Sequence, residues 1–480
     1  MPAGECYISR HGSNDISDCQ TNSSGSSSTS PFAFAGMAGA GGGLDLTASL
    51  RDLFKQMSET QEGFPPIMFL QALRTAFPQF AQRSREGPGY AQQDAEEAWS
   101  QIITQLRQKL KIKDKGDSDA TASTEISFID KFMIGKSKSV MECDDPSAKE
   151  AGEQPVEAED TFIKLNCHIN ADTNHLRDGL AAGLIEKIEK KSSVLDRNAG
   201  YTKTSQISRL PKYLTVHFLR FDWRKDTNKK AKILRKVTFP QELDTVEFCT
   251  ADLKKMLVPI REKIRDIRKE EEDVERARKR QKRMKNGEEN TPDKERELKG
   301  KEPATEKGLA SGKKESQKSS DAVATSSGGD TDMPDVEYKT DAQVEAERAA
   351  SILASKKELL GLVNEKLSAD SGANQTGLYE LRGVITHQGI SADSGHYTAF
   401  IKKAARNDPV TGKPKPEDGK WWWFNDDKVS EVDTDRIETL SGGGKSSCCA
   451  IKFASNTNPS NQVKVTRRLF YFTVQSLCHL

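Results

Sequence analysis

A long, strongly charged stretch at residues 251–370 separates two apolar parts of this 480-residue chain. It begins with the amphipathic segment "ADLKKMLVPIREKIRDI" and continues into alternating acidic and basic residues and a Ser/Lys/Asp/Gly tract. Alternating charge of this kind is typical of a solvated helix or a disordered insert. The stretch ends in a second predicted helix, whose apolar residues share one face: Leu359, Leu360, Val363 and Leu367. The folded part must therefore be assembled from segments on both sides of the stretch.

The composition favours one folded domain that is interrupted and flanked by disordered segments. Apolar residues make up 35% of the chain and charged residues 30%, which is polar for a fully packed protein of this size. A net charge of +1 gives the chain no overall electrostatic attraction to nucleic acid or to an acidic membrane, and we expect neither as a partner. The cluster "RARKRQKRMK" could be a nuclear localisation signal, but a solvated helix face is the favoured interpretation.

The spacing of the cysteines and the length of the apolar runs indicate where in the cell the protein is located. The eight cysteines are scattered and lack the paired spacing of a zinc site: Cys6, Cys19, Cys143, Cys167, Cys249, Cys448, Cys449 and Cys478. This pattern favours reduced thiols over a disulfide framework, and we expect no metal and no other cofactor. No apolar run approaches the roughly 18 residues of a membrane span. We expect a soluble protein of the cytoplasm, with the nucleus as a second location.

Hydrophobic spacing predicts both helices and strands outside the charged stretch. Residues 45–112 carry three helical patterns, the third with acidic residues in its first turn and basic residues in its last. Residues 142–160 look like an acidic loop, and residues 175–189 like a helix. The strongest strand is "RLPKYLTVHFLRFDW" at residues 209–223, and β character returns in "LYELRGVITHQG", "HYTAFIKK" and "KWWWFNDDKVSEV".

Two histidines lie among these last strands. If "HYTAFIKK" pairs with "KWWWFNDD" across the Pro/Gly-rich loop between them, His396 falls opposite three polar residues: Asn425, Asp426 and Asp427. Such a pair would be the base and orienter of a catalytic triad, with the orienter accepting the Nδ1 proton and Nε2 acting as the base. The geometry is equally compatible with a structural strand-edge histidine. For His387, a structural or loop-positioning role is favoured over a catalytic one.

These residues resemble the histidine box of the ubiquitin-specific proteases, the papain-like deubiquitinases. Upstream, "YAQQDAEEAWSQI" and "ISRLPKYLTVHFLRFDW" are similar to the branch of that family that associates with the proteasome. The resemblance implies an α+β papain-like fold with a helical thumb, a β palm and β fingers. It also implies hydrolysis of the (iso)peptide bond after the C-terminal glycine of ubiquitin through a thioester. The implied partners are ubiquitin, ubiquitinated proteins and the proteasome.

The resemblance also implies roles for individual residues. His396 would be the general base and Asn425 its orienter, with Asp426 as the alternative orienter. Asp94 and Tyr397 match positions that contact the extended C-terminal tail of ubiquitin.

The sequence departs from the family pattern at several places. We find no Gly-Asn-Thr-Cys-Tyr-like box, which holds the nucleophile of the family, and no ubiquitin-like domain of the branch. Before the first helical block stand only Cys6 and Cys19, without the helix that would lower a thiol pKa, so we predict no nucleophile in this sequence. Ala98 replaces a family cysteine, and "KSSCCAIKFASN" replaces the last palm strand. An incomplete gene model, a ubiquitin-binding pseudoenzyme and a scaffold built on the charged stretch all remain open.

The predicted organisation has six segments. They are a disordered tail (1–43), a helical thumb remnant (44–112), fingers and palm (113–250), a charged helical or disordered insert (251–370), a palm segment with the histidine box (371–444) and a divergent tail (445–480).

Overall fold

The computed structural model describes residues 45–59, 66–84, 87, 89–91, 93–114, 124–224, 229–285, 340–389, 395–403, 417–426, 428–442 and 446–455. The chain forms two compact units, one from residues 1–261 and 363–480 and the other from residues 262–362. Helices and strands both contribute to the first unit, as the predicted α+β class requires. None of the described helices combines the length and the apolar character that crossing a bilayer needs.

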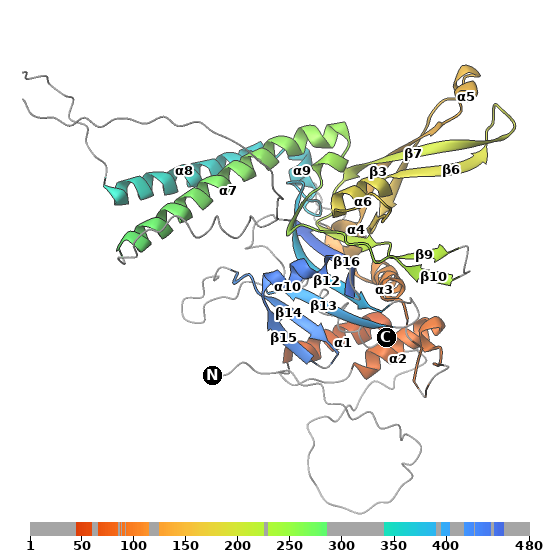
Figure 1. Ribbon diagram of the computed structural model, residues 1–480, viewed down its shortest axis with the longest axis horizontal. Coiled ribbons are helices and arrows are strands. Elements are labelled where there is room, and N and C mark those ends of the chain that lie inside the picture. Colours follow the sequence, from red (N-terminus) through yellow and green to blue (C-terminus); the bar gives the residue numbers. More distant parts are fainter. Residues whose placement is uncertain are drawn as a thin grey trace, which may run out of the picture. The chain divides into compact units, whose positions relative to one another are not determined.

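The first unit is built around a sheet that we call the palm (Figure 1). Its strands lie in the order β15-β14-β13-β12-β16-β8-β5, and β11 pairs with β12. The bounds are β5 Leu165–Cys167, β8 Tyr213–Phe218, β11 Glu242–Asp244, β12 Leu378–Gln388, β13 His396–Lys402, β14 Trp421–Asn425, β15 Lys428–Val432 and β16 Ser446–Ser455. Strand β12 is therefore the central element, because it pairs with β11, β13 and β16.

Strand β16 corrects the prediction that residues 445–480 diverge from the fold. Residues 446–455 pair with β12 on one side and with β8 on the other. Successive residues from Ile451 to Ser455 are all buried, so the strand is covered on both faces and lacks the polar alternation that identifies a half-buried strand. That is why the sequence pattern did not reveal it. Residues 456–480 lie outside the described ranges.

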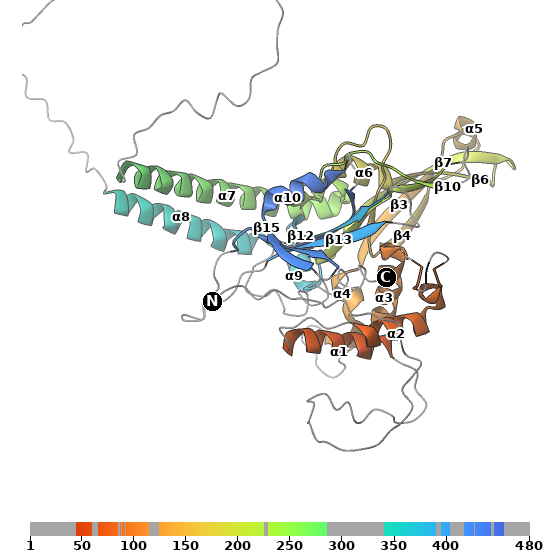
Figure 2. The same ribbon diagram turned by 60° about the horizontal axis from the view of Figure 1, so that its bottom comes forward.

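The thumb consists of three helices, α1 Leu46–Glu59, α2 Ile67–Ala76 and α3 Ala95–Lys109, with a short 3₁₀ turn η1 Pro78–Ala81. They confirm the three helices predicted within residues 45–112. Helix α3 begins at Asp94, whose carboxylate accepts a hydrogen bond from the Glu96 amide at 2.7 Å. The helices cover one face of the palm (Figure 2), in one core that includes the thumb residues Phe69, Leu73, Trp99 and Ile102 and the palm residues Ile385, Tyr397, Ala399 and Phe424.

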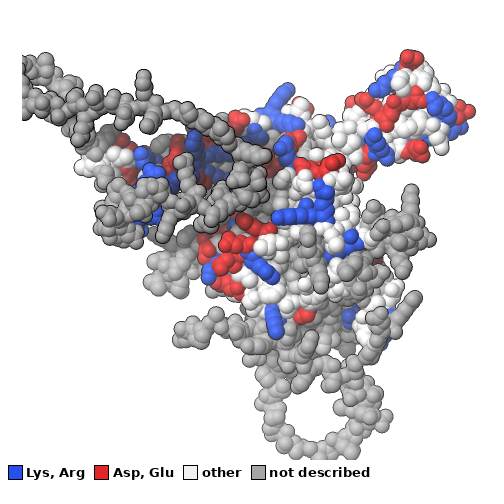
Figure 3. Space-filling view, viewed as in Figure 1, with Lys and Arg blue, Asp and Glu red and all other residues white. Residues whose placement is uncertain are grey.

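A second sheet, which we call the fingers, has the order β4-β3-β7-β6. Its strands are β3 Gly135–Cys143, β4 Val156–Phe162, β6 Ile185–Lys191 and β7 Asn198–Arg209, with helix α4 Phe128–Phe132 before them and α5 Pro146–Glu150 between β3 and β4. Acidic and basic side chains intermix over its surface (Figure 3), and exposed ion pairs such as Lys138–Glu159 cross its strands.

The fingers correct two predictions. The loop expected over residues 142–160 contains α5 and the start of β4. The helix expected over residues 175–189 ends early, since α6 spans Leu176–Gly183 and the chain then enters β6. At its last residue a Cβ on Gly183 would lie 2.3 Å from the carbonyl oxygen of Asn166, so the backbone passes close to Asn166 where the helix ends. Strand β6 is mostly exposed and is specified by its pairing with β7, which the local pattern does not show.

Two hairpins and several short elements complete the unit. The hairpins are β1 Lys111–Asp114 with β2 Thr124–Ser127, and β9 Phe221–Arg224 with β10 Lys229–Lys232. The short elements are η2 Val246–Phe248, α9 Glu365–Ala369, α10 Thr434–Glu438 and η3 Thr439–Ser441.

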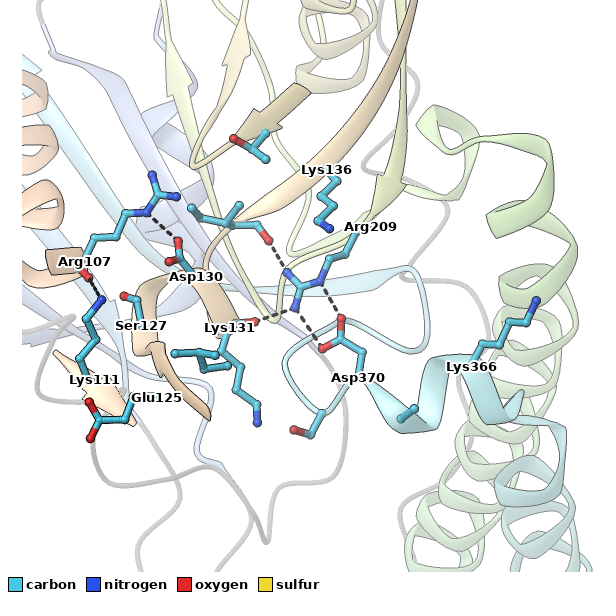
Figure 4. Close-up of a pocket in the computed structure, with 15 residues that line it drawn as sticks. Arg107, Lys111, Glu125, Ser127, Asp130, Lys131, Lys136, Arg209, Lys366 and Asp370 are labelled. Carbon is cyan, nitrogen blue, oxygen red and sulfur yellow. Dashed lines mark hydrogen bonds and ion pairs between the residues drawn. The ribbon is translucent and has the colours of Figure 1, made fainter. Parts of the chain in front are cut away.

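Arg209, at the end of the fingers strand β7, forms hydrogen bonds to three neighbouring residues (Figure 4). Its Nε donates to Asp370 Oδ2 at 2.6 Å, and its Nη2 donates to Asp370 Oδ1 at 3.0 Å and to the Lys131 carbonyl at 2.7 Å. Its Nη1 donates to the carbonyl of Ile134. One side chain therefore joins β7, α4 and the segment after α9, on the wall of an open hollow of about 740 Å³.

The second unit contains most of α7 Ala251–Lys285 and α8 Asp341–Leu362. Lys356 pairs with Glu271 at 2.6 Å, so ion pairs join the two helices. The basic cluster at residues 276–285 continues α7; the side chains of residues 278–283 are exposed, and i,i+4 pairs such as Lys279–Glu275 at 2.9 Å form, which agrees with the solvated helix face. The predicted closing helix is wrong at its end, because Asn364 caps a separate helix, α9, that contains Leu367.

Candidate active site

His396 opens β13 and Asn425 closes β14, and the strand register brings them to one face. Ala399 pairs with Phe424, so one further step sets Thr398 opposite Asn425. His396 and Thr398 share a face because side chains alternate along a strand. The Nε2 atom of His396 lies 2.5 Å from Oδ1 of Asn425. The ring and the amide therefore meet on the same side of the sheet, as the hairpin count predicted.

The nitrogen that meets the amide corrects the prediction. We expected Nδ1 to face the orienter and Nε2 to be the base. Because Oδ1 of Asn425 can only accept, Nε2 carries the ring hydrogen and Nδ1 keeps its lone pair. The reason is reach: Nδ1 is next to the carbon that joins the ring to the backbone, whereas Nε2 is at the far side of the ring, toward the neighbouring strand. The atom available as a base is Nδ1.

Asp426 lies farther from the ring than Asn425. Its Oδ2 is 3.8 Å from Nε2 of His396, beyond hydrogen-bonding distance. The residue has a φ of 50° in the turn between β14 and β15, which directs its side chain differently from that of Asn425. Asp426 can act on the imidazole only through its charge, and both side chains are more than a third exposed, so water screens that effect. Asp427 lies outside the described residues.

Asp94 and Tyr397 line one narrow hollow between α3 and the palm. The Asp94 side chain is exposed and caps α3. Tyr397 is only 7% exposed, and burial raises the pKa of its hydroxyl well above its ordinary value although a backbone hydrogen bond from Ala95 opposes this. The structure thus brings these two residues together. Their contact with the tail of ubiquitin stays a prediction.

Two further residues of this hollow were missed from the sequence. Lys452 on β16 is 8% exposed, and burial lowers its pKa to about 7. Its Nζ lies 5.6 Å from the centre of the Trp99 ring. Trp99 is 4% exposed, and among the described residues its indole N–H has no acceptor. A lysine inside the apolar run "CCAIKFA" was the signal that pointed to a buried charge.

Four of the described cysteines have thiols with raised pKa values, and the fifth, Cys143, is buried at the end of the fingers strand β3. Cys167, Cys249 and Cys448 are buried, and Cys449 is partly buried. Burial raises the pKa of Cys167, Cys249 and Cys449 to about 12 and that of Cys448 well above its ordinary value, so these thiols stay protonated at neutral pH. Cys449 lies in the hollow with Tyr397, where its thiol donates to the Ile385 carbonyl at 3.3 Å.

Cys6 and Cys19 lie outside the described residues, so the predicted lack of a nucleophile stays a prediction. Within the described ranges, no group of three or more His, Cys, Asp or Glu side chains is arranged to hold a metal ion.

His387 lies on the opposite face of the sheet from His396. It pairs with Tyr397 across β12 and β13, is completely buried and packs against the tilted Tyr397 ring at 4.7 Å between centroids. Burial and the charge of Lys232 lower its pKa to about 4, so the ring is neutral at physiological pH. A neutral, enclosed imidazole on this face agrees with the structural or positioning role and not with that of the base.

A palm sheet that ends in a His–Asn pair, with a helical thumb on one face and a separate fingers sheet, defines a papain-like deubiquitinase fold. Residues 7–459 match the family model of the ubiquitin carboxyl-terminal hydrolases. The chain belongs to this family, which includes the ubiquitin-specific proteases, and the resemblance inferred from the histidine box is confirmed.

Curated relatives support the assignment. The chain is 40% identical over 400 residues to ubiquitin carboxyl-terminal hydrolase 6 of Schizosaccharomyces pombe, covering 83% of this chain and 68% of that protein. It is 34% identical to ubiquitin carboxyl-terminal hydrolase 6 of Arabidopsis thaliana, covering 83% and 65%, and 29% identical to ubiquitin carboxyl-terminal hydrolase 14 of Caenorhabditis elegans, covering 83% and 60%. The chain thus spans about two thirds of the length of these relatives. A solved SAGA DUB module bound to monoubiquitin matches with a TM-score of 0.42 and 16% identity, over 85% of this chain and 58% of that one.

Proposed function

We propose that this chain is a deubiquitinase of the cysteine-protease type, which hydrolyses the (iso)peptide bond after the C-terminal glycine of ubiquitin. Family membership supports the reaction class. The observation that carries the proposal is the contact of His396 Nε2 with Asn425 Oδ1 at 2.5 Å, which leaves Nδ1 as the base. Asn425 holds the tautomer and the ring orientation, and Asp426 adds a weak negative field. Asp94 and Tyr397 contact the tail of the substrate ubiquitin.

In this mechanism Nδ1 of His396 takes the proton of a cysteine thiol, and the thiolate attacks the carbonyl carbon of the C-terminal glycine of ubiquitin. The amine leaves with the proton from the imidazolium, and water then cleaves the thioester. The raised pKa values of the buried cysteines make them unfit for this step. The predicted lack of a nucleophile concerns the source of this thiolate, and Cys6 and Cys19, upstream of the thumb, are the residues on which that prediction is tested.

The second candidate function is binding without cleavage, as a ubiquitin-binding pseudoenzyme or scaffold. It is favoured by the raised pKa values of four described thiols, those of Cys167, Cys249, Cys448 and Cys449. A palm and fingers without a nucleophile would still present a surface to ubiquitin but could not form a thioester.

Hydrolysis of a ubiquitin–fluorophore conjugate, combined with direct ubiquitin binding by calorimetry, tests both. We expect the native chain to hydrolyse the conjugate, His396→Gln to lower the rate at least ~100-fold, and Asn425→Ala to lower it less. Asp426→Asn is the matched control, and we expect it to keep most of the rate. Cys6→Ser and Cys19→Ser identify the source of the thiolate. If the chain binds ubiquitin but does not hydrolyse the conjugate, the pseudoenzyme is the correct function. If it neither binds ubiquitin nor hydrolyses the conjugate, both proposed functions are refuted.

We further propose that the chain acts on proteasome-bound substrates in the cytoplasm and the nucleus. The support is the similarity of its sequence blocks to the proteasome-associated branch of the family. Co-sedimentation of the full chain with purified proteasomes tests it, with ubiquitin-loaded and ubiquitin-free proteasomes compared. Equal sedimentation with and without proteasomes would contradict the partner but not the hydrolytic activity.

A further inference from the structure

Lys232, at the end of β10, directs its ammonium group into the end of β12. Its Nζ donates to the carbonyl oxygens of His387 at 2.7 Å and Gly389 at 3.1 Å, and it lies 3.1 Å from Nδ1 of His387. An ammonium group has three hydrogens and no acceptor. The three contacts therefore use all three hydrogens, and Nδ1 of His387 must be the acceptor in the third.

This contact fixes the state of the His387 ring. A ring that accepts at Nδ1 and is neutral carries its hydrogen on Nε2. The ring cannot turn away easily, because it is completely buried between two aromatic rings, with Phe221 at 5.7 Å and Tyr397 at 4.7 Å between centroids. Within the described residues, Nε2 of this ring has no hydrogen-bond partner.

The Nε2 edge of this ring lies against Gly395. A Cβ added to Gly395 would lie 2.3 Å from that Nε2 and 2.5 Å from the carbonyl oxygen of Gln388. The φ of Gly395 is +156°, in the range that side chains rarely adopt. The backbone of Gly395 therefore rests directly on the imidazole of His387, and the next residue in the chain is His396.

We propose that Lys232 and His387 form a positioning pair. On the thumb face of the palm, the pair fixes the position of the Gly395 backbone, and this holds the imidazole of the next residue, His396, against Asn425 on the other face. The inference rests on the proposed role of His396 as the base. Since Lys232 belongs to β10, the pair also ties the β9–β10 hairpin to the backbone that carries the base. His387 and Lys232 act through Gly395 and are not themselves catalytic.

Imidazole NMR of the full chain, labelled with ¹⁵N-histidine at pH 7, tests this without depending on turnover. The seven histidines can be assigned by single substitution. In the native chain we expect His387 and His396 each to give a single set of ring ¹⁵N signals, the set of a neutral imidazole that carries its hydrogen on Nε2. In Lys232→Met we expect His387 to lose its single pattern, and the His396 signal to split or broaden because its backbone support is loosened. Lys236→Met is the matched control, since it removes the same charge from an exposed lysine four residues later.

His387→Gln is the second variant. Its amide oxygen can still accept from Lys232, but it lacks the ring that supports Gly395, so we expect the His396 signal to change here too. Urea unfolding midpoints verify that each variant is folded. An unchanged His396 pattern in either folded variant would overturn the positioning pair. Because the readout needs neither ubiquitin nor a nucleophile, a failure of the proposed hydrolysis would leave this result interpretable.

Discussion

Replacing the buried Lys452 by methionine should stabilise the protein strongly at neutral pH. Burial lowers the pKa of this ammonium from 10.5 to about 7. Between these values the unfolded chain holds a proton that the folded chain has released, so the free energy of unfolding rises as the pH rises from 7 to 10.5. A tenfold change in proton affinity is worth about 1.4 kcal/mol, so at pH 7 the lysine costs the folded chain roughly 4 kcal/mol, and at pH 10 only about 1 kcal/mol.

Methionine has a similar length and no charge, so Lys452→Met should recover most of this cost. Urea unfolding at pH 7 and pH 10 measures it, with Lys138→Met as a control from an exposed strand position, expected to change the free energy of unfolding by less than about 1 kcal/mol. We expect a gain of roughly 4 kcal/mol at pH 7 that shrinks toward pH 10. A gain below about 1 kcal/mol at pH 7, or one of the same size at both pH values, would refute the reasoning.

Two further stability predictions use matched pairs of variants, each measured by urea unfolding. Arg209→Met should cost about 2–3 kcal/mol, because it strips a half-buried aspartate and two carbonyls of their donor, whereas Arg107→Met, which breaks a more exposed arginine–aspartate pair, should cost less than about 1 kcal/mol. Equal losses would show that burial does not decide the strength of these pairs. Gly395→Ala should cost about 2 kcal/mol because its Cβ would collide with the backbone and with His387, while Gly87→Ala, with nothing within 4 Å, should be neutral. A neutral Gly395→Ala would contradict the close contact.

The thumb helices and the His–Asn pair could be predicted because local signals suffice for both. The third thumb helix has its Asp94 cap and its charges at the correct ends, and its apolar face recurs at helical spacing. The pairing of His396 with Asn425 follows from counting outward from a hairpin loop whose Pro and Gly residues mark its limits. Such counting gives the face and the approximate partner, but not which ring nitrogen makes the contact, since that depends on the direction of the ring between the strands.

The fingers strands and β16 could not be predicted because their structure is decided by partners distant in the sequence. Strand β6 has an exposed, lysine-rich sequence that alone would suit a helix, and its pairing with β7 decides its conformation. Strand β16 pairs with β12 and β8, whose residues lie 58 or more positions away in the sequence, and the residues from Ile451 to Ser455 are all buried, so its sequence shows no alternation. The buried Lys452 adds a charge where a core strand is expected to be apolar, which further concealed the strand.

Tyr397 sets a condition on how ubiquitin can be engaged. It adjoins His396 in the sequence, yet the alternation of the strand turns it to the thumb face, where it is buried and takes a hydrogen bond from the backbone of Ala95 at the start of α3. Direct contact with an extended tail would therefore require α3 to separate from β13. The base needs no such change, because the contact of His396 with Asn425 is already formed on the opposite face. In the proposed mechanism, substrate binding and base orientation thus depend on different faces of the same strand, so a Tyr397 substitution that weakens ubiquitin binding need not disturb the imidazole of His396.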